Sequence, residues 1–160
     1  MVKKETAFFG AGCFWHVEVA FSNVKGVLDT KVGYMGGDEN KYSKPTYKEV
    51  CTDETGYAEV VKVIYDSDKI SYSKLLGIFW KIHDPTLLNR QGLDVGTQYR
   101  SVIFYLNDEE KKTAEKSRAK IEKKIGRKIM TDIVKAGKFF EAEEYHQKYL
   151  EKRGLSTCPV

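Results

Sequence analysis

Short apolar segments of β character alternate with helical segments along most of the chain, and this alternation restricts the fold more than any other feature. The β segments are rich in valine, isoleucine and aromatic residues, which favour strands. We expect strands at residues 6–10, 28–34, 58–65, 99–105 and 130–135. The helical segments repeat apolar residues at a spacing that places them on one face. We expect helices at residues 13–21, 71–82, 109–125 and 141–151.

The order of these segments, β-α-β-β-α-β-α-β-α, predicts an α+β fold, a single-domain α/β sandwich around a mixed, ferredoxin-like sheet. The polar, glycine-punctuated stretches at residues 36–50 and 84–98 are expected to be long functional loops, because they are rich in aromatic and polar groups. The length of 160 residues fits one domain. We therefore expect one domain over residues 1–160, with a flexible C-terminal tail at residues 152–160.

Charge and cysteine content limit the class of protein. The chain has 27 basic and 23 acidic side chains, a net charge of +4, which is too small an excess to indicate nucleic-acid binding. No apolar stretch approaches the roughly 20 residues of a membrane-spanning helix. Three widely spaced cysteines, Cys13, Cys51 and Cys158, fit neither a disulfide framework nor a zinc site. We expect a cytoplasmic protein with no metal and no nucleic-acid or membrane partner.

Cys13 is the first candidate for chemistry. It follows Gly10, Ala11 and Gly12 at the point where a predicted strand ends and a predicted helix begins, and glycine allows a sharp turn there. The positive end of the helix would favour the thiolate, which is the nucleophilic form of cysteine. The alternative is a cysteine that packs as a small buried apolar residue, and its position alone does not decide between the two.

The residues after Cys13 allow several interpretations. Phe14 and Trp15 could enclose a methyl or thioether group, although the pattern favours core packing for Phe14, and Trp15 points to a different helix face. His16 lies three residues after Cys13, so the two could form a cysteine hydrolase pair or supply two metal ligands. The spacing places no third partner beside them.

Glu59, Tyr47 and Tyr99 are further candidates. Glu59 opens an apolar strand, and partial burial there would raise its pKa and let it act as an acid near neutral pH. Tyr47 and Tyr99 lie where loops meet regular elements, and their hydroxyls could orient an oxygen atom. The alternatives are a surface strand residue for Glu59 and half-buried packing for the two tyrosines.

Seven segments carry a resemblance that covers nearly the whole chain. They are residues 12–15 (Gly-Cys-Phe-Trp), 33–37, 45–51, 55–61, 79–85, 90–101 and 144–150. In this order they resemble peptide methionine sulfoxide reductase A, the family specific for the S epimer of the sulfoxide. The resemblance implies an oxidoreductase that reduces methionine-S-sulfoxide, protein-bound or free, to methionine.

The resemblance also implies a role for each matching residue. Cys13 would attack the sulfoxide sulfur and become a sulfenic acid. Glu59 would donate a proton to the sulfoxide oxygen, and Tyr47 and Tyr99 would hydrogen-bond that oxygen.

Substrate contacts follow from the same resemblance. Phe14 and Trp15 would enclose the substrate methyl group. Asp94 would lie near the main-chain side of the substrate.

Regeneration of the thiol requires a second cysteine and an external reductant. The resemblance implies that a resolving thiol forms a disulfide with Cys13 and that a dithiol, usually thioredoxin, then reduces it. Cys158 is favoured because it lies in a terminal tail, where loop closure costs little. Cys51 is the rival, at a position that resembles a structural cysteine of the family. No bound cofactor is expected, and nothing demands an oligomer, so a monomer is expected.

Two other classes of function stay open from the residues alone. One is the cysteine hydrolase that would use Cys13 and His16. The other is a redox-sensing or oxidised-methionine-binding module without turnover.

Overall fold

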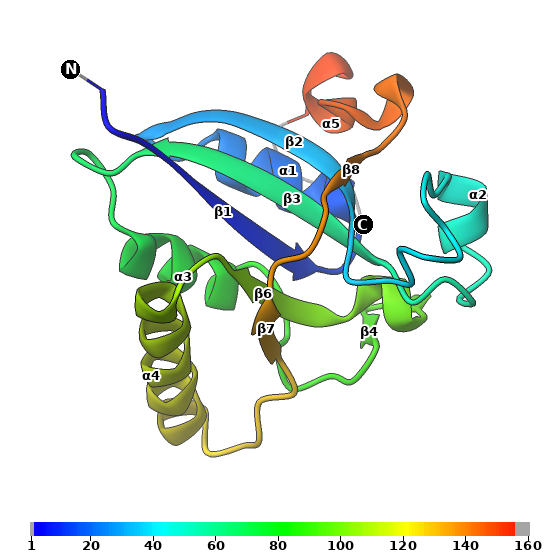
Figure 1. Cartoon of the computed structure of the whole chain (residues 1–160). Helices are drawn as coiled ribbons and strands as arrows, with labels where there is room; N and C mark the ends of the chain where they lie inside the picture. Colours follow the sequence, from blue (N-terminus) through cyan, green and yellow to red (C-terminus); the bar gives the residue numbers. More distant parts are fainter. Residues whose placement is uncertain (1, 156–160) are drawn as a thin grey trace.

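A six-stranded mixed sheet forms the centre of the computed structural model, which describes residues 2–155 (Figure 1). The strands follow the order β7-β6-β1-β3-β2-β8. Their bounds are β1 (Lys4–Ala11), β2 (Val27–Met35), β3 (Ala58–Asp66), β6 (Ser101–Tyr105), β7 (Asp132–Lys135) and β8 (Phe140–Glu141). The predicted α+β fold with a mixed sheet is confirmed.

The four central strands, β6-β1-β3-β2, are antiparallel throughout. Helix α1 (Phe14–Ser22) connects β1 to β2, and helix α3 (Tyr72–Lys81) connects β3 to β6. In the sheet, β3 lies between β1 and β2, and β1 lies between β3 and β6. Each helical connection therefore crosses over one strand, and this gives the ferredoxin-like order. Strand β7 pairs parallel to β6 and makes the sheet mixed.

The two faces of the sheet bury different sets of side chains because successive residues of a strand point to opposite faces. Ala7 and Phe9 of β1 belong to the main core with the helices, whereas Phe8 belongs to a smaller cluster on the other face. The chain between β7 and β8 runs across that second face (Figure 1), and Phe139 packs against the smaller cluster. Both faces of the sheet are therefore covered at the end that carries the candidate residues.

The helices begin where capping residues predict. Ser71 accepts a hydrogen bond from the N–H of Lys74 at 3.1 Å at the start of α3. Asn107 does the same for Glu110 at 2.9 Å and starts α4 (Asp108–Ile125), which ends at Gly126 with φ 74°. Within residues 2–155, no helix is long and apolar enough to cross a membrane.

The predicted helix at residues 141–151 is wrong. Strand β8 takes Phe140–Glu141, a 3-10 helix takes Glu144–His146, and only α5 (Tyr149–Lys152) is α-helical. The side chain of Gln147 bonds both backbone groups of Val32 at 2.9 Å, so a tertiary contact breaks the helix. The expected tail falls partly on α5, and its residues 156–160 lie outside the described part of the chain.

The two long loops contain short elements of their own. The first includes α2 (Tyr47–Val50), which Thr46 and Glu49 cap reciprocally. The second includes β4 (Arg90–Gln91) and β5 (Asp94–Val95), which pair as a small ribbon, and a 3-10 helix at Thr97–Tyr99. This 3-10 helix delays the start of β6 to residue 101, two residues later than predicted.

Candidate active site

Cys13 lies at the turn between β1 and α1, where it is the N-cap residue of the helix. Gly12 before it has φ 96°, a conformation that side chains rarely adopt. A Cβ at Gly12 would also approach the side chain of Gln91 to 2.9 Å. Glycine therefore both makes the turn and lets the loop of residues 84–98 pack beside Cys13.

Glu59 is a buried acid at the same helix end. Its side chain is 2% exposed, and Oε1 accepts a hydrogen bond from the backbone N–H of Phe14 at 3.1 Å. Oε2 is buried and has no hydrogen-bond partner among the described residues. Burial raises the pKa of Glu59 from 4.5 to about 8, and the charge of Asp94 adds to the effect. At neutral pH Glu59 is therefore mostly protonated.

The expected thiolate at Cys13 is wrong for the resting site. The backbone N–H groups of Trp15 and His16 act to lower the pKa of the thiol, as a helix N-terminus should. Burial raises this pKa and the charge of Glu59 raises it further, so that it reaches about 12. The thiol keeps its proton because these two effects exceed the contribution of the helix end.

Two phenol groups lie close enough to Glu59 for its charge to act on them. Burial raises the pKa of Tyr47, and its hydrogen bond to the sulfur of Cys51 and the charge of Glu59 raise it further. Burial also raises the pKa of Tyr99, followed by the charges of Glu59 and Asp94. Both phenols remain protonated at neutral pH and can act as hydrogen-bond donors. The structure thus brings Tyr47 of α2 near the acid, and Tyr99 of the 3-10 helix near both the acid and the thiol.

Asp94 and Cys51 lie at the border of this group. Asp94 is an exposed residue of β5, and its charge acts on Cys13, Glu59 and Tyr99. Cys51 is an exposed free cysteine that accepts a hydrogen bond from Tyr47, so it does not pack in the core as a structural cysteine would. Cys158 lies outside the described residues.

Phe14 and Trp15 differ in their surroundings. Phe14 is buried, and its ring centroid lies 5.1 Å from that of His146 and 5.9 Å from that of Tyr34. Core packing, which the pattern favoured for Phe14, is what the structure contains. Trp15 is half-buried on another face of α1, where its ring stacks on Tyr149 with centroids 3.8 Å apart.

Three residues of the C-terminal segment belong to this site, although residue types and spacing did not single them out. His146 accepts a hydrogen bond at Nδ1 from Nε1–H of Trp15 at 2.9 Å, and Tyr149 stacks on the same indole. Glu143 accepts hydrogen bonds from the hydroxyl of Tyr34 and from the backbone N–H of Tyr47, both at 3.0 Å. The only signal was that His146 and Tyr149 fall within the matching segment at residues 144–150.

His16 does not form the arrangement that a hydrolase pair needs. Its Nε2–H donates to the backbone carbonyl of Ile82 at 3.2 Å, at the end of α3. Its other ring nitrogen, Nδ1, is buried and has no hydrogen-bond partner among the described residues, so the imidazole does not hydrogen-bond the thiol of Cys13. Within residues 2–155, no group of three or more histidine, cysteine or acidic side chains could hold a metal ion.

Comparisons with known proteins agree on one family. The family model described as peptide methionine sulfoxide reductase matches residues 5–160. The peptide methionine sulfoxide reductase MsrA of Methanothermobacter thermautotrophicus is 58% identical over 156 residues, which cover 96% of this chain and 90% of that protein.

Solved structures agree with the sequence matches. The reduced form of Mxr1 from Saccharomyces cerevisiae has a TM-score of 0.91 at 40% identity, with 95% of this chain and 87% of that chain covered. Mxr1 in complex with Trx2 has a TM-score of 0.66 at 28% identity, with 99% and 88% covered.

Proposed function

This chain belongs to the peptide methionine sulfoxide reductase family, and from that premise we propose that it reduces methionine-S-sulfoxide, protein-bound or free, through a sulfenic acid on Cys13. The chain is thus an oxidoreductase. One observation supports the site assignment above the others: the thiol of Cys13 and the protonated acid of Glu59 meet at one helix end, and Oε2 of Glu59 is buried with no partner among the described residues.

The sulfoxide oxygen is the group that such an acid suits. A sulfoxide sulfur is a poor electrophile while its oxygen carries negative charge, so donors at the oxygen stabilise the transition state. Glu59 supplies the proton, and Tyr47 and Tyr99 donate hydrogen bonds. Tyr47 would exchange its present acceptor, the sulfur of Cys51, for the substrate oxygen.

The first step then balances without a cofactor. The thiol of Cys13 and one sulfoxide become a sulfenic acid and one methionine, so the cysteine sulfur loses two electrons and the methionine sulfur gains two. Phe14 and Trp15 would enclose the methyl group of the substrate. Asp94, on the exposed ribbon beside the thiol, would face the main-chain side of the substrate.

The second step regenerates the thiol. A second cysteine attacks the sulfenic acid, which gives a disulfide and water, and an external dithiol such as thioredoxin reduces the disulfide. The complex of Mxr1 with Trx2 supports a thioredoxin as the reductant. We assign the resolving role to Cys158, with Cys51 as the rival at the border of the site.

A stereospecific assay tests the proposed function. The S and R sulfoxides of an acetylated methionine amide are offered separately with dithiothreitol, and methionine release is measured. We expect many turnovers with the S sulfoxide and none with the R sulfoxide. Equal rates with the two epimers, or a single turnover only, would contradict the proposal, and hydrolysis of an activated ester serves as the check for a cysteine hydrolase.

Mass spectrometry after one turnover without reductant tests the resolving step. We expect a disulfide between Cys13 and Cys158, and in the Cys158→Ser variant a sulfenic acid on Cys13 that dimedone traps. The Cys51→Ser variant is the matched control and should still form the disulfide. A link between Cys13 and Cys51 in the unaltered protein would contradict the assignment of Cys158.

A further inference from the structure

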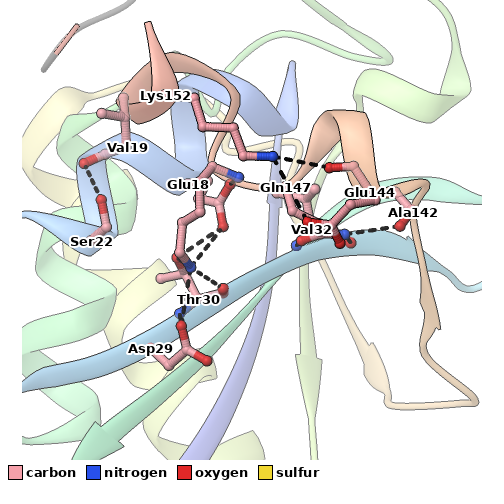
Figure 2. Close-up of polar contacts among 11 residues, drawn as sticks. Glu18, Val19, Ser22, Asp29, Thr30, Val32, Ala142, Glu144, Gln147 and Lys152 are labelled. Carbon is pink, nitrogen blue, oxygen red and sulfur yellow. Dashed lines mark hydrogen bonds and ion pairs between the residues drawn. The ribbon is translucent and has the colours of Figure 1, made fainter. Parts of the chain in front are cut away.

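A buried carboxylate outside the candidate active site joins α1 to the C-terminal segment. Glu18 is 2% exposed, and its Oε1 accepts a hydrogen bond from the backbone N–H of Lys148 at 2.7 Å. Its Oε2 accepts from the hydroxyl of Thr30 at 2.9 Å and lies 3.4 Å from the ammonium of Lys148. Figure 2 shows Glu18 and Thr30 directed towards each other. A buried charge is retained only where it is paired in this way.

Both the backbone conformation and the side-chain contacts of Lys148 are fixed by its surroundings. Its φ of 54° and ψ of 34° lie in the left-handed region, where a residue with a side chain is strained. Its ammonium also contacts Asp29 Oδ1 at 3.0 Å, the hydroxyl of Thr30 at 2.9 Å and the carbonyl of Thr30. Such strain persists where the surroundings determine the conformation. We call Glu18, Asp29, Thr30 and Lys148 the Glu18–Lys148 clamp.

The clamp lies beside the contacts that hold the indole of Trp15. Glu18 is three residues after Trp15 on α1, and residues at this spacing are neighbours on a helix surface. Lys148 lies between His146, which accepts the indole N–H, and Tyr149, which stacks on the indole ring. The clamp and the contacts of Trp15 therefore both connect α1 to the C-terminal segment. A shift of Lys148 would move both partners of Trp15, which are His146 and Tyr149.

We propose that Glu18 and Lys148 are positioning residues for the substrate pocket, because the clamp anchors the turn that sets the indole of Trp15. This inference rests on the proposed function, in which Trp15 encloses the substrate methyl group. The methyl group contacts the indole before and during the reaction alike. Loss of the clamp should therefore weaken substrate binding more than it slows the chemical step.

The test uses Lys148→Met, which removes the ammonium and keeps most of the side-chain length. We expect KM for the S sulfoxide to rise about tenfold with less than a twofold change in kcat, since the contact of one small apolar group with its pocket is worth roughly tenfold or more and is made equally before and during the reaction. In a Trp80→Phe background, which leaves Trp15 as the single tryptophan, its fluorescence spectrum should change.

Two variants define the controls. Lys148→Arg keeps a cation near Glu18 and should restore most of the lost affinity. Lys152→Met removes a charge from the same segment, where the exposed ammonium lies 3.8 Å from Glu144, and should leave KM and the fluorescence of Trp15 unchanged. Equal effects of Lys152→Met and Lys148→Met would overturn the proposal.

The remaining outcomes also decide the question. A folded Lys148→Met variant with unchanged KM and unchanged Trp15 fluorescence would overturn the proposal. If that variant fails to fold, Glu18→Gln, which keeps the volume of the side chain, is measured in the same way, and unchanged values there would overturn it. Absence of turnover in the unaltered protein would count against the proposed function, while the fluorescence comparison would still test the clamp.

Discussion

Replacement of Cys13 by serine should abolish turnover of the S sulfoxide and leave the fold intact. A serine hydroxyl cannot take up the oxygen as a sulfenic acid, so the catalytic cycle has no first step. The loss should approach the whole acceleration, which is about 10⁶-fold or more in typical enzymes. Serine is also a favoured N-cap residue, so α1 should start as before. The measurement is methionine release with dithiothreitol, beside a thermal melt of the variant.

The matched control for this experiment is Cys51→Ser. Cys51 is exposed, so the substitution should leave the protein folded, and the first step should still release one methionine per chain in a single turnover. Turnover that survives in folded Cys13→Ser would remove Cys13 from the mechanism. Loss of the first step in Cys51→Ser would mean that Cys51, which accepts a hydrogen bond from Tyr47, takes part in sulfoxide reduction itself and not only in the later resolving step.

The fold could be predicted well where a segment's own sequence determines its structure. The alternating apolar residues of β3 and the capping residues Ser71 and Asn107 are local signals, and the elements that they indicate are present. The segment at residues 141–151 looks helical by itself but is not one helix, because Gln147 bonds β2 and Lys148 bonds Glu18. Such contacts join residues more than 100 positions apart, and no local pattern carries them.

The site could be predicted less well from the residues alone. Cys13 follows from a local pattern, a glycine turn at a helix start. Its grouping with Glu59, Tyr47 and Tyr99 came from the resemblance, since these residues lie on separate elements whose approach no spacing defines. The thiolate was wrong because a local view of the helix end leaves out the burial of Cys13 in the folded chain and, after it, the charge of Glu59, which is 45 positions from Phe14 and accepts its N–H.

The two protons of the resting site explain why the thiol and the acid belong together. Cys13, with a pKa of about 12, and Glu59, with a pKa of about 8, each hold a proton at neutral pH. The proton of Glu59 passes to the sulfoxide oxygen as the sulfur of Cys13 attacks, and the proton of the thiol replaces it on the carboxylate of Glu59. The charge of Glu59 adds to the effect of burial on the pKa of Cys13. A protonated Glu59 therefore both supplies a proton to the sulfoxide oxygen and makes the thiol easier to deprotonate.

Glu59→Gln should therefore slow the first step and, at the same time, make the thiol of Cys13 easier to deprotonate. Formation of the sulfenic acid should slow by about 10²- to 10⁴-fold, the usual contribution of a general acid. At the same time the pKa of Cys13 should fall, because burial still raises it but the charge of Glu59 no longer adds to that effect. The measurements are single-turnover methionine release and the pH dependence of alkylation by iodoacetamide, which reports the thiolate.

The pH profile separates an acid from a residue that only supports the fold. Burial raises the pKa of Glu59, so the acid form persists through neutral pH and is lost above about 8. The rate of the first step in the unaltered protein should fall about tenfold per unit above that pH, as expected when one required proton is lost, and the fall should be absent in Glu59→Gln. Glu54→Gln, at an exposed position five residues earlier, should keep the profile of the unaltered protein. An unchanged single-turnover rate in Glu59→Gln, or the same fall above pH 8, would show that another group supplies the proton to the sulfoxide oxygen.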